Sequence, residues 1–484
     1  MRPTNLLFIL SDQHTRSGLG CYGGPGITPH LDALARRGTR FDAAYTNCPI
    51  CVPERASLAT GRYVHEIGFW DNGIPYDGSV PSWGHHLRGE GFTVDSIGKL
   101  HFRSSDDDNG FSREIEPLHV VEGLGDLLSC VRDDPPRRNA RRGVQAAGPG
   151  DSTYLTYDIR NADNAIAWLR EHAAAPKPWV LFLSFVCPHP PYIGPEPWYR
   201  RYREMEGDVP LPPQWQPEQW PRNPAMAHFR HFFHQDEPFT EEELRNLNAA
   251  YYAACSHLDA QIGRVLAALA ELGLAGDTRV IYSSDHGESA GARDLTGKFT
   301  MYDESAGVPL IVAGPDVPEG RAVATPVSLV DCYPAVVSAV GGTPAAGLPG
   351  GDLWQLAAGP EQDRTVFSEY HAIGSASAQY MLRDARYKYN YYLDGPPQLF
   401  DLAADPEERH DLAESPDREA AALLARFEAG LRELLDPEAV DRRAKADQAA
   451  RVAAYGGREA VLARGTFANS PTPDDKPTWA YPGA

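Results

Sequence analysis

Short apolar runs alternate with longer segments of helical spacing along most of this chain. The apolar runs are typical of buried strands and cover residues 4–10, 92–97, 179–186, 279–284 and 308–312. Between them, apolar positions three or four apart predict helices at residues 29–37, 82–88, 161–175, 240–272 and 327–340. This alternation predicts an α/β fold with a large, mostly parallel sheet that is flanked by helices on both faces.

The longest predicted helix has a well-marked start. Thr240 and Glu243 have the spacing of a capping box, in which each side chain bonds the backbone N–H of the other residue. Phe239 and Leu244 stand where a hydrophobic staple would pack. Apolar spacing continues to about Leu272, so we expect one long helix.

The sequence pattern changes near residue 378. Short hairpin-like segments with turns at residues 394–395 and 404–405 precede a predicted helix at 418–435. We therefore expect a large α/β domain over residues 1–377, a smaller C-terminal α+β subdomain over 378–445, and an extended tail over 446–484. The tail is rich in Ala, Gly and Pro. We expect it to run over the surface or onto a neighbouring subunit, which would make the protein a homo-oligomer.

The chain is strongly acidic, with 45 Lys and Arg against 66 Asp and Glu and a formal net charge of −21. Nucleic acids and anionic membranes attract basic surfaces, so neither is an expected partner. The first apolar run is cut off at Ser11-Asp12, which makes it too short for a signal peptide or a membrane span. We therefore expect a cytoplasmic protein.

A protein this acidic must concentrate positive charge locally if it handles an anion. One basic run lies in a Pro- and Gly-rich stretch and consists of Arg137, Arg138, Arg141 and Arg142. Such runs are usually solvated loops, and the alternative is a lid that draws anions in. The sequence leaves both interpretations open.

Four chemically capable residues lie within a few positions of predicted strand ends: Asp12, Lys99, His189 and Asp285. In open α/β sheets ligands bind beyond the carboxyl ends of the strands. These residues are far apart in sequence, but we expect the fold to bring them to one rim of the sheet.

The stretch "NCPICVPERASLATG" at residues 47–61 raises a question about its two cysteines. Cys48 and Cys51 have the spacing of a redox pair or half a zinc site, yet no second C-x-x-C completes a zinc site. Pro53 suits the first turn of a helix and Gly61 its C-terminal end. Cys51 would then lie at a helix N-terminus, where backbone N–H groups favour an oxyanion, with Arg55 one turn further on.

The segment C-V-P-E-R, residues 51–55, followed by "ASLATG", resembles the sulfatase signature C-x-P-x-R. Further segments resemble this family in the expected order: "ILSDQ" at 9–13, "GKLH" at 98–101, "CPHPPY" at 187–192, "YSSDHGE" at 282–288 and "GKFTMYDESAGVPLIV" at 297–312. The resemblance covers roughly residues 4–435. The chain is therefore identified as a member of the sulfatase branch of the alkaline phosphatase superfamily, which implies an alkaline-phosphatase-like fold.

The resemblance also implies a nucleophile and a metal site. A formylglycine-generating maturation enzyme would oxidise Cys51 to Cα-formylglycine, and its hydrated aldehyde would be the nucleophile. Asp12, Asp285 and His286, with the diol of residue 51, would hold one divalent cation.

The remaining implied roles concern charge and protons. Arg55, Lys99 and Lys298 would neutralise the substrate's oxygens in the transition state. His101 and His189 would serve as general acid and general base. Lys99, His189 and Lys298 would also bind the substrate, and Asn72 stands where one branch of the family has a substrate-contacting asparagine.

Three positions depart from the common family pattern. Gln13 replaces a second aspartate, His286 replaces an asparagine, and Glu54 replaces a small residue in the signature. The first two departures resemble choline sulfatases and phosphonate monoester hydrolases. An imidazole and fewer carboxylates weaken the case for Ca²⁺ and admit Mn²⁺ or Zn²⁺.

The resemblance implies a hydrolase of sulfate monoesters that acts on a small anionic ester. A second hypothesis keeps the site and changes the substrate to phosphonate monoesters or phosphodiesters. A third differs in class: a non-catalytic anion-binding or redox protein with unmodified Cys51.

Overall fold

The computed structural model describes residues 2–481. Its centre is an eight-stranded sheet with the order β11-β2-β10-β9-β1-β7-β4-β5. These strands are β1 (Asn5–Asp12), β2 (Gly38–Phe41), β4 (Thr93–Lys99), β5 (Arg113–Leu118), β7 (Trp179–Pro188), β9 (Thr278–Ser284), β10 (Leu310–Ala313) and β11 (Arg321–Val323). All neighbours are parallel except β10, which is antiparallel to both β9 and β2. The predicted mostly parallel sheet is confirmed.

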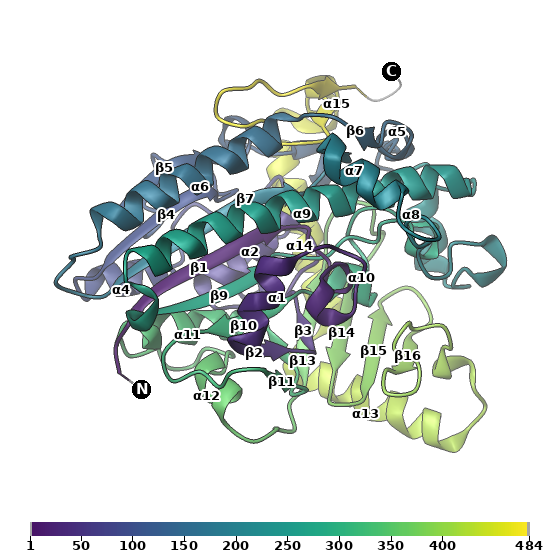
Figure 1. Ribbon diagram of the computed structural model, residues 1–484. Coiled ribbons are helices and arrows are strands. Elements are labelled where there is room, and N and C mark those ends of the chain that lie inside the picture. Colours follow the sequence, from purple (N-terminus) through teal and green to yellow (C-terminus); the bar gives the residue numbers. More distant parts are fainter. Residues whose placement is uncertain (1, 482–484) are drawn as a thin grey trace.

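Helices cover both faces of this sheet (Figure 1). One face carries α1 (Pro29–Arg36), α6 (Thr153–Glu171), α7 (Glu196–Arg203) and α9 (Glu241–Glu271); the other carries α2 (Cys51–Thr60), α4 (Trp83–Gly89), α11 (Cys332–Ala339) and α12 (Leu353–Ala358). Successive side chains of β1 alternate between the two: Leu7 and Ile9 pack toward α6 and α9, and Phe8 toward the opposite helices. Burial on both faces explains why these strands are continuous apolar runs.

Shorter elements connect the layers. They are β3 (Ala44–Tyr45), α3 (Val64–Ile67), α5 (Arg141–Gln145), β6 (Gly148–Pro149), β8 (Ile193–Gly194), α8 (Pro224–Phe232), α10 (Asp303–Ala306) and β12 (Val327–Ser328). The segment predicted as one helix at 327–340 is only partly helical. Val327 and Ser328 pair with β3, and after a single 3₁₀ turn α11 forms the rest. The β-branched Val327 suits this pairing better than a helix start.

The capping box of the longest helix is confirmed. The Thr240 hydroxyl accepts from the backbone N–H of Glu243 at 3.2 Å, and the Glu243 carboxylate accepts from the backbone N–H of Thr240 at 2.8 Å. Helix α6, predicted to begin at residue 161, begins eight residues earlier, at Thr153. The Ser152 side chain caps it by accepting from the backbone N–H of Leu155.

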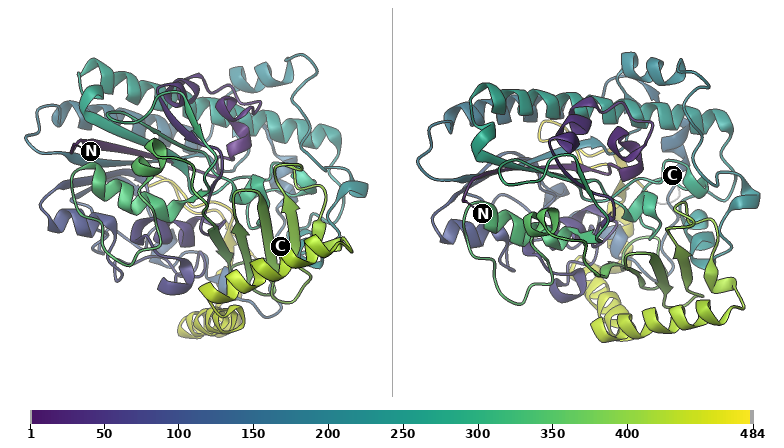
Figure 2. Two further views of the ribbon diagram at one scale, coloured as in Figure 1. Left: turned by 90° about the horizontal axis from the view of Figure 1, so that it is seen from below. Right: turned by 60° about the horizontal axis from the view of Figure 1, so that its bottom comes forward.

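A second, antiparallel sheet forms the smaller part. Its strands are β13 (Val366–Tyr370), β14 (Gln379–Arg383), β15 (Tyr387–Tyr392) and β16 (Gln398–Asp401). Helix α13 (Arg418–Leu434) lies across it (Figure 2) and packs Phe427 and Leu431 against its apolar face. The expected boundary at 377/378 falls between β13 and β14, which are hydrogen-bonded neighbours, so this sheet begins at Val366.

The expectation of an extended tail from residue 446 is wrong for its first part. Helix α14 (Pro437–Ala454) runs through this point and α15 (Gly457–Arg464) follows. The start signal Asp436-Pro437 marks α14, but its few buried positions give no apolar stripe.

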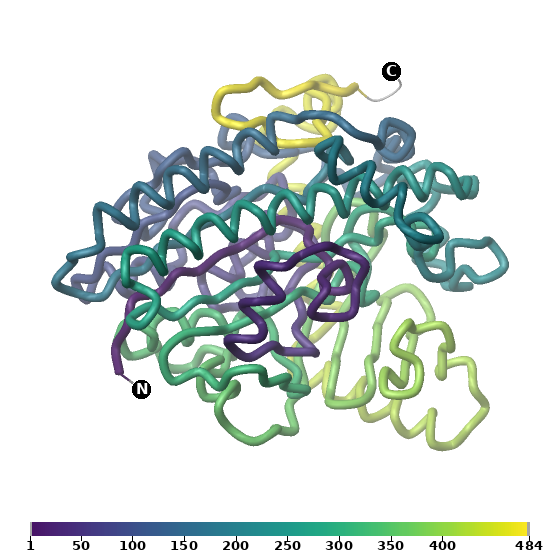
Figure 3. Tube along the Cα trace, in the orientation of Figure 1, coloured from purple at the N-terminus to yellow at the C-terminus, as the bar shows by residue number. Residues whose placement is uncertain are grey.

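The last segment contains β17 (Thr466–Phe467) and β18 (Trp479–Ala480). It packs against the large domain of the same chain, as the yellow end of the tube shows (Figure 3). Arg160 pairs with Asp474 at 2.6 Å, and Arg464 pairs with Glu122 at 2.9 Å. The tail therefore folds back onto the large domain of the same subunit.

Candidate active site

The strand register brings the expected residues to one rim. Asp12, the last residue of β1, is opposite Pro188 of β7, the residue before His189. On the other side of β1, Ser11 is opposite Ser284, the residue before Asp285. Lys99 ends β4, which lies beside β7. The four residues predicted to meet therefore lie together at the carboxyl ends of adjacent parallel strands.

Helix α2 carries Cys51 to this rim. The helix begins at Cys51 and ends before Gly61, whose φ of 66° is the left-handed conformation of a helix C-terminus. The backbone N–H groups of its first turn have no carbonyl partner within the helix. The N–H of Val52 donates to the side-chain oxygen of Asn72 at 3.2 Å. The predicted helix with residue 51 at its N-terminus is confirmed, and Asn72 lies beside it.

Four donor groups surround one point at the rim. The ligand atoms of Asp12, Cys51, Asp285 and His286 lie within 4.8 Å of one another, and all four residues are buried. The Cys51 sulfur is 3.1 Å from His286 Nε2. The other ring nitrogen, Nδ1, donates to the Gly287 carbonyl at 3.1 Å, which leaves the Nε2 lone pair for a ligand. Burial lowers the pKa of His286 to about 4, so the imidazole is neutral. Two carboxylates and a neutral imidazole fit a divalent cation.

Arg55 lies behind this cluster and holds its carboxylates. Its Nε donates to Asp285 at 2.8 Å and its Nη2 to Asp12 at 3.3 Å. Its Nη1 donates to the Lys99 carbonyl at 2.7 Å and the Ser184 hydroxyl at 2.9 Å. These bonds engage four of the five N–H groups of the guanidinium, and Arg55 is not among the residues that line the active-site cavity, so the geometry gives it a positioning role. A contact with substrate oxygens stays a prediction.

Two lysines supply positive charge close to the nucleophile position. Lys99 Nζ is 2.6 Å from a carboxylate oxygen of Asp12, and Lys298 Nζ is 3.1 Å from the Cys51 sulfur. Burial alone would raise the pKa of Asp12, but Lys99 and the neighbouring cations hold that pKa well below its usual range. Asp12 is therefore a carboxylate, the form that a cation requires.

Gln13 turns away from the donor cluster. Its side-chain oxygen accepts from Lys298 Nζ at 2.7 Å, and its amide nitrogen donates to the buried carboxylate of Glu288. The structure thus uses Gln13 to aim Lys298 at residue 51.

The two expected acid–base histidines both line the cavity above residue 51. His189 Nδ1 donates to the Pro190 carbonyl at 2.8 Å, which leaves Nε2 free to face a substrate. His101 Nε2 is 2.7 Å from the hydroxyl of Ser470. Burial is the main reason why the pKa of each histidine lies well below its usual range. A nearby lysine lowers it further, Lys99 in the case of His101 and Lys298 in the case of His189. Both imidazoles are neutral before a substrate anion arrives.

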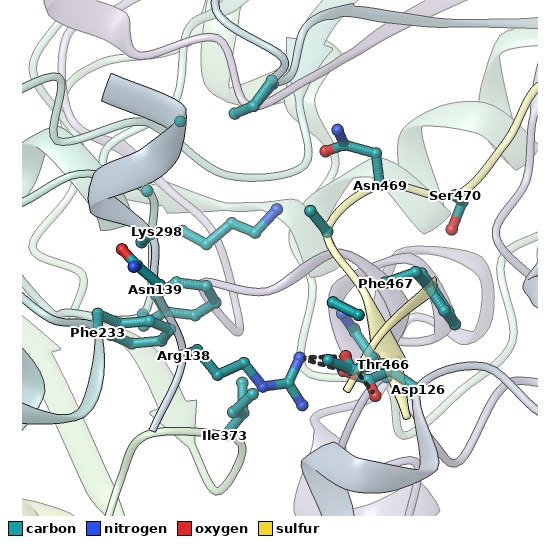
Figure 4. A pocket seen from close by; sticks show the side chains of 18 of the residues that line it. Asp126, Arg138, Asn139, Phe233, Lys298, Ile373, Thr466, Phe467, Asn469 and Ser470 are labelled. Atoms are coloured by element: carbon teal, nitrogen blue, oxygen red, sulfur yellow. Dashed lines mark hydrogen bonds and ion pairs between the residues drawn. The ribbon is translucent and has the colours of Figure 1, made fainter. Parts of the chain in front are cut away.

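The cavity has a volume of about 1000 Å³. Its lining includes Cys51, His101, His189 and Lys298, and it also includes three arginines of the basic run and residues of the C-terminal tail. Figure 4 shows Lys298 pointing into the cavity and tail residues Phe467, Asn469 and Ser470 along one side. This space is far larger than a sulfate group, so it accommodates a sizeable leaving group.

The sequence analysis missed the tail as a part of the site. Ser470 contacts His101 through its side chain, and its carbonyl accepts from the Tyr154 hydroxyl at 2.5 Å. No motif announces this contact, since it joins residues 369 positions apart. Of four aromatic residues near the motifs, Tyr192 lines the cavity, and the other three pack in the core: Phe69, Trp70 and Phe102.

The redox interpretation of Cys48 and Cys51 finds no support. All seven cysteines lie in the described part of the chain and are free thiols there. Burial and then the neighbouring Asp12 raise the pKa of the Cys51 thiol, whereas reactive cysteines need a lowered pKa. Cys48 is buried in an apolar cluster.

Glu54, the unusual residue of the signature, turns away from the site and fastens the loop before α2. It accepts from the Thr46 hydroxyl at 2.8 Å and from the backbone N–H groups of Asn47 and Cys48 at 2.7 and 2.8 Å. The Asn47 side-chain amide is a fourth donor, at 3.0 Å. Glu54 is therefore a structural buttress of the segment that presents Cys51.

We expect Glu54→Ala to lower the free energy of unfolding by about 3 kcal/mol, because buried donors would lose their acceptor. Glu54→Gln is the matched control, since its amide oxygen can replace the carboxylate oxygen that accepts three of the four bonds, and its loss should be clearly smaller. Urea denaturation of both variants measures the difference. Equal stability of Glu54→Ala and the unmodified sequence would contradict this role.

Fold and site together define this protein as an ester hydrolase of the alkaline phosphatase superfamily. A family model described as Sulfatase matches residues 4–342, and one described as N-sulphoglucosamine sulphohydrolase, C-terminal, matches residues 291–435. The chain therefore belongs to the sulfatase family, as its motifs predicted.

Individual relatives agree with this assignment. The chain is 31% identical over 475 residues to a choline-sulfatase of Rhizobium meliloti (strain 1021), covering 93% of this chain and 90% of that one. It is 31% identical over 446 residues to arylsulfatase K of Homo sapiens, covering 85% and 79%. Among solved structures, the phosphonate monoester hydrolase SpPMH from Silicibacter pomeroyi superposes with a TM-score of 0.71 at 26% identity, covering 89% and 94%.

In residues 2–481, no helix is long and apolar enough to cross a bilayer.

Proposed function

We propose that this protein hydrolyses sulfate monoesters with a Cα-formylglycine made from Cys51 as its nucleophile. The observation that carries the proposal is the place of residue 51: it starts α2, lies 3.1 Å from both Lys298 Nζ and His286 Nε2, and opens into the large cavity. One hydroxyl of the hydrated aldehyde, as its alkoxide, attacks sulfur, and the bond between sulfur and the alcohol oxygen breaks, so that residue 51 carries the sulfate group. The second hydroxyl then gives up its proton as the aldehyde re-forms and sulfate leaves.

The residues at the rim divide the remaining work. Asp12, Asp285 and His286 would hold a divalent cation, which would supply Lewis acidity to stabilise negative charge at the reacting oxygens. Lys298 lines the cavity and neutralises a sulfate oxygen. Lys99 adds a second positive charge close to the site, where it pairs with Asp12.

The histidines move the protons. His189, with Nε2 free to face the cavity, protonates the leaving oxygen, and His101 takes the proton of the second hydroxyl. Asn72 binds the substrate and keeps the start of α2 in place through Val52. A substrate anion raises the pKa of both histidines and so favours the charged form that a general acid requires.

A mass spectrum of the peptide that contains residue 51, from protein produced with a formylglycine-generating enzyme, tests the nucleophile. The aldehyde mass is expected. A persistent thiol, together with full sulfate-ester turnover, would refute the proposed nucleophile.

Hydrolysis of phosphonate monoesters or phosphodiesters is the second candidate. Two observations favour it. Gln13 and His286 stand where many sulfatases have an aspartate and an asparagine, and the chain is similar to SpPMH. Paired kinetics of phenyl sulfate, phenyl phenylphosphonate and diphenyl phosphate decide between the substrates. We expect kcat/KM for phenyl sulfate to be at least about tenfold that for either phosphorus ester, which corresponds to a difference of about 1.4 kcal/mol in activation free energy. The reverse order would make the phosphorus esters the substrates.

The candidates for the cation are Mn²⁺ and Ca²⁺, with Zn²⁺ a further candidate; the imidazole in the donor set suits Mn²⁺ and Zn²⁺ better than Ca²⁺, which prefers oxygen ligands alone. Metal analysis of the purified protein distinguishes them. The maturation enzyme as a partner, the cytoplasmic location and the homo-oligomer stay predictions.

Ser470→Ala is expected to lower kcat about fivefold with little change in KM, well short of the 10²–10⁴ lost with an acid–base group itself. Its hydroxyl holds the ring of His101, so its loss misplaces a proton acceptor. Steady-state kinetics at several pH values measure the effect. Ser470→Thr, which keeps the hydroxyl, should restore kcat, and equal loss in both variants would show that packing alone is involved.

A further inference from the structure

The lining of the active-site cavity carries more basic than acidic side chains, although the protein has a net charge of −21. Beyond Lys298, the lining contains Arg137, Arg138 and Arg142. Within residues 2–481, its only carboxylate is that of Asp126. The arginines belong to the basic run whose role the sequence left open.

Arg138 has hydrogen-bonding capacity that the protein does not use. Its Nη1 donates to Asp126 and to the Thr466 hydroxyl, both at 2.6 Å (Figure 4). Its Nε and Nη2 are shielded from water and have no acceptor among the described residues. Leaving the N–H groups of a cation buried and unpaired is costly. A ligand cannot reach these two groups in this conformation; because Arg138 lines the cavity, a turn of its side chain toward an anion in the cavity would give them an acceptor and relieve this cost.

Asp126 does not compete for such a ligand. One of its oxygens accepts from Arg138, and the other accepts from Thr466 at 3.1 Å. The carboxylate therefore orients the guanidinium and makes no bond to Nε or Nη2, which stay without an acceptor. Thr466 belongs to the tail, so the tail completes this arrangement.

The other arginines of the run divide into two kinds. Arg137 is held by Asp236, and Arg141 turns to Glu243 at 3.1 Å and does not line the cavity. Arg142 lines the cavity, and in the described part of the chain only its backbone N–H donates to a side chain, that of Asn139 at 3.3 Å, while its guanidinium makes no hydrogen bond or ion pair. Arg138 and Arg142 are thus available to a ligand, whereas Arg137 and Arg141 are occupied.

We infer that Arg138 and Arg142 bind a second anionic group, carried by the leaving alcohol of the substrate. The inference rests on the proposed function and narrows it to sulfate esters whose alcohol bears its own carboxylate, sulfate or phosphate. A cavity of about 1000 Å³ has room for such an alcohol. A quaternary ammonium alcohol such as choline would instead face like charges, which disfavour it. The substrate class of this chain therefore differs from that in the name of its choline-sulfatase relative.

Matched aryl sulfates test the inference. The 3- and 4-carboxyphenyl sulfates are compared with the corresponding carbamoylphenyl sulfates, which have nearly the same shape but no charge. We expect the better carboxylate to exceed its amide at least about tenfold in kcat/KM, and Arg142→Gln and Arg138→Gln each to reduce this ratio about tenfold. The 4-trimethylammoniophenyl sulfate should be the poorest substrate. A ratio near one, or a ratio that neither variant changes, would overturn the inference.

Arg141→Gln is the matched control, because it removes a neighbouring arginine that faces away from the cavity; its ratio should equal that of the unmodified sequence. If Arg138→Gln unfolds, Arg142→Gln decides alone. A binding experiment separates this inference from the proposed function. Calorimetry with 4-sulfobenzoate and 4-carbamoylbenzenesulfonate measures the anion site without turnover. If no aryl sulfate is hydrolysed but 4-sulfobenzoate binds more tightly than 4-carbamoylbenzenesulfonate, the proposed function is rejected and the anion site is supported. If aryl sulfates are hydrolysed but the two compounds bind equally, only the anion site is rejected.

Discussion

Cys51→Ala is expected to abolish sulfate-ester hydrolysis, with a fall in kcat of at least about 10⁴-fold, the scale of losing a nucleophile. The other members of the donor cluster are two carboxylates and an imidazole, which the proposed mechanism uses as metal ligands and which could not replace the diol of residue 51 as nucleophile. Since the substitution removes only one buried sulfur atom, the protein should stay folded. Initial rates with phenyl sulfate and thermal unfolding of the same preparation measure both effects.

Cys48→Ala is the matched control for this experiment. Cys48 is as buried as Cys51 and lies three residues before it, but it packs in an apolar cluster away from the cavity. We expect turnover of Cys48→Ala to stay within about twofold of the unmodified sequence, because a small core substitution at a residue that does not line the cavity changes stability rather than chemistry. A fully active Cys51→Ala protein would exclude residue 51 as the nucleophile.

Removal of the metal is expected to have the second largest effect, a loss of at least about 10³-fold in kcat/KM after dialysis against EDTA, since a bound cation contributes several kcal/mol to transition-state stabilisation. Asp12 and Asp285 are fully buried carboxylates, and Asp12 is ionised. Without the cation, the positive charge that activates the diol is missing from the site. Addition of Mn²⁺ or Ca²⁺ should restore activity, and it should raise the melting temperature because a ligand bound only by the folded state stabilises that state.

Asp285→Asn tests the same site without a chelator. The amide keeps the shape of the side chain and removes one charged ligand, so metal affinity and turnover should fall together. Metal titration followed by calorimetry and by activity checks this. Full activity of metal-free protein would exclude a role for the cation, and unchanged affinity in Asp285→Asn would place the metal elsewhere.

Much of the site was accessible to sequence reasoning, because its residues follow strand ends or start a helix. Buried parallel strands are recognisable as apolar runs, and the residue after such a run lies at the rim whatever the loops do. This is why Asp12, Lys99, His189 and Asp285 were predicted to meet. Likewise, Pro53 and Gly61 define the limits of α2, since each has a backbone preference that few other residues share.

The exact course of secondary structure was less accessible where local preference and tertiary pairing compete. Residues 327–340 have helical spacing, yet Val327 and Ser328 pair with β3 because this strand is present to receive them. Helix α14 was missed for the opposite reason. It buries few side chains, among them Ala444 and Gln448, so it lacks the apolar stripe by which a helix is recognised.

The sequence by itself determined the fold class, the family and the set of residues at the rim, because these depend on periodicity and on short motifs. Only the tertiary structure decided what each side chain faces. It directed Arg55 to the carboxylates of Asp12 and Asp285, and it placed the Gln13 side-chain oxygen on Lys298. It also placed Ser470 on His101, a contact between residues 369 positions apart. The direction of a long or distant side chain is set by packing against residues that are remote in sequence, and no local pattern records it.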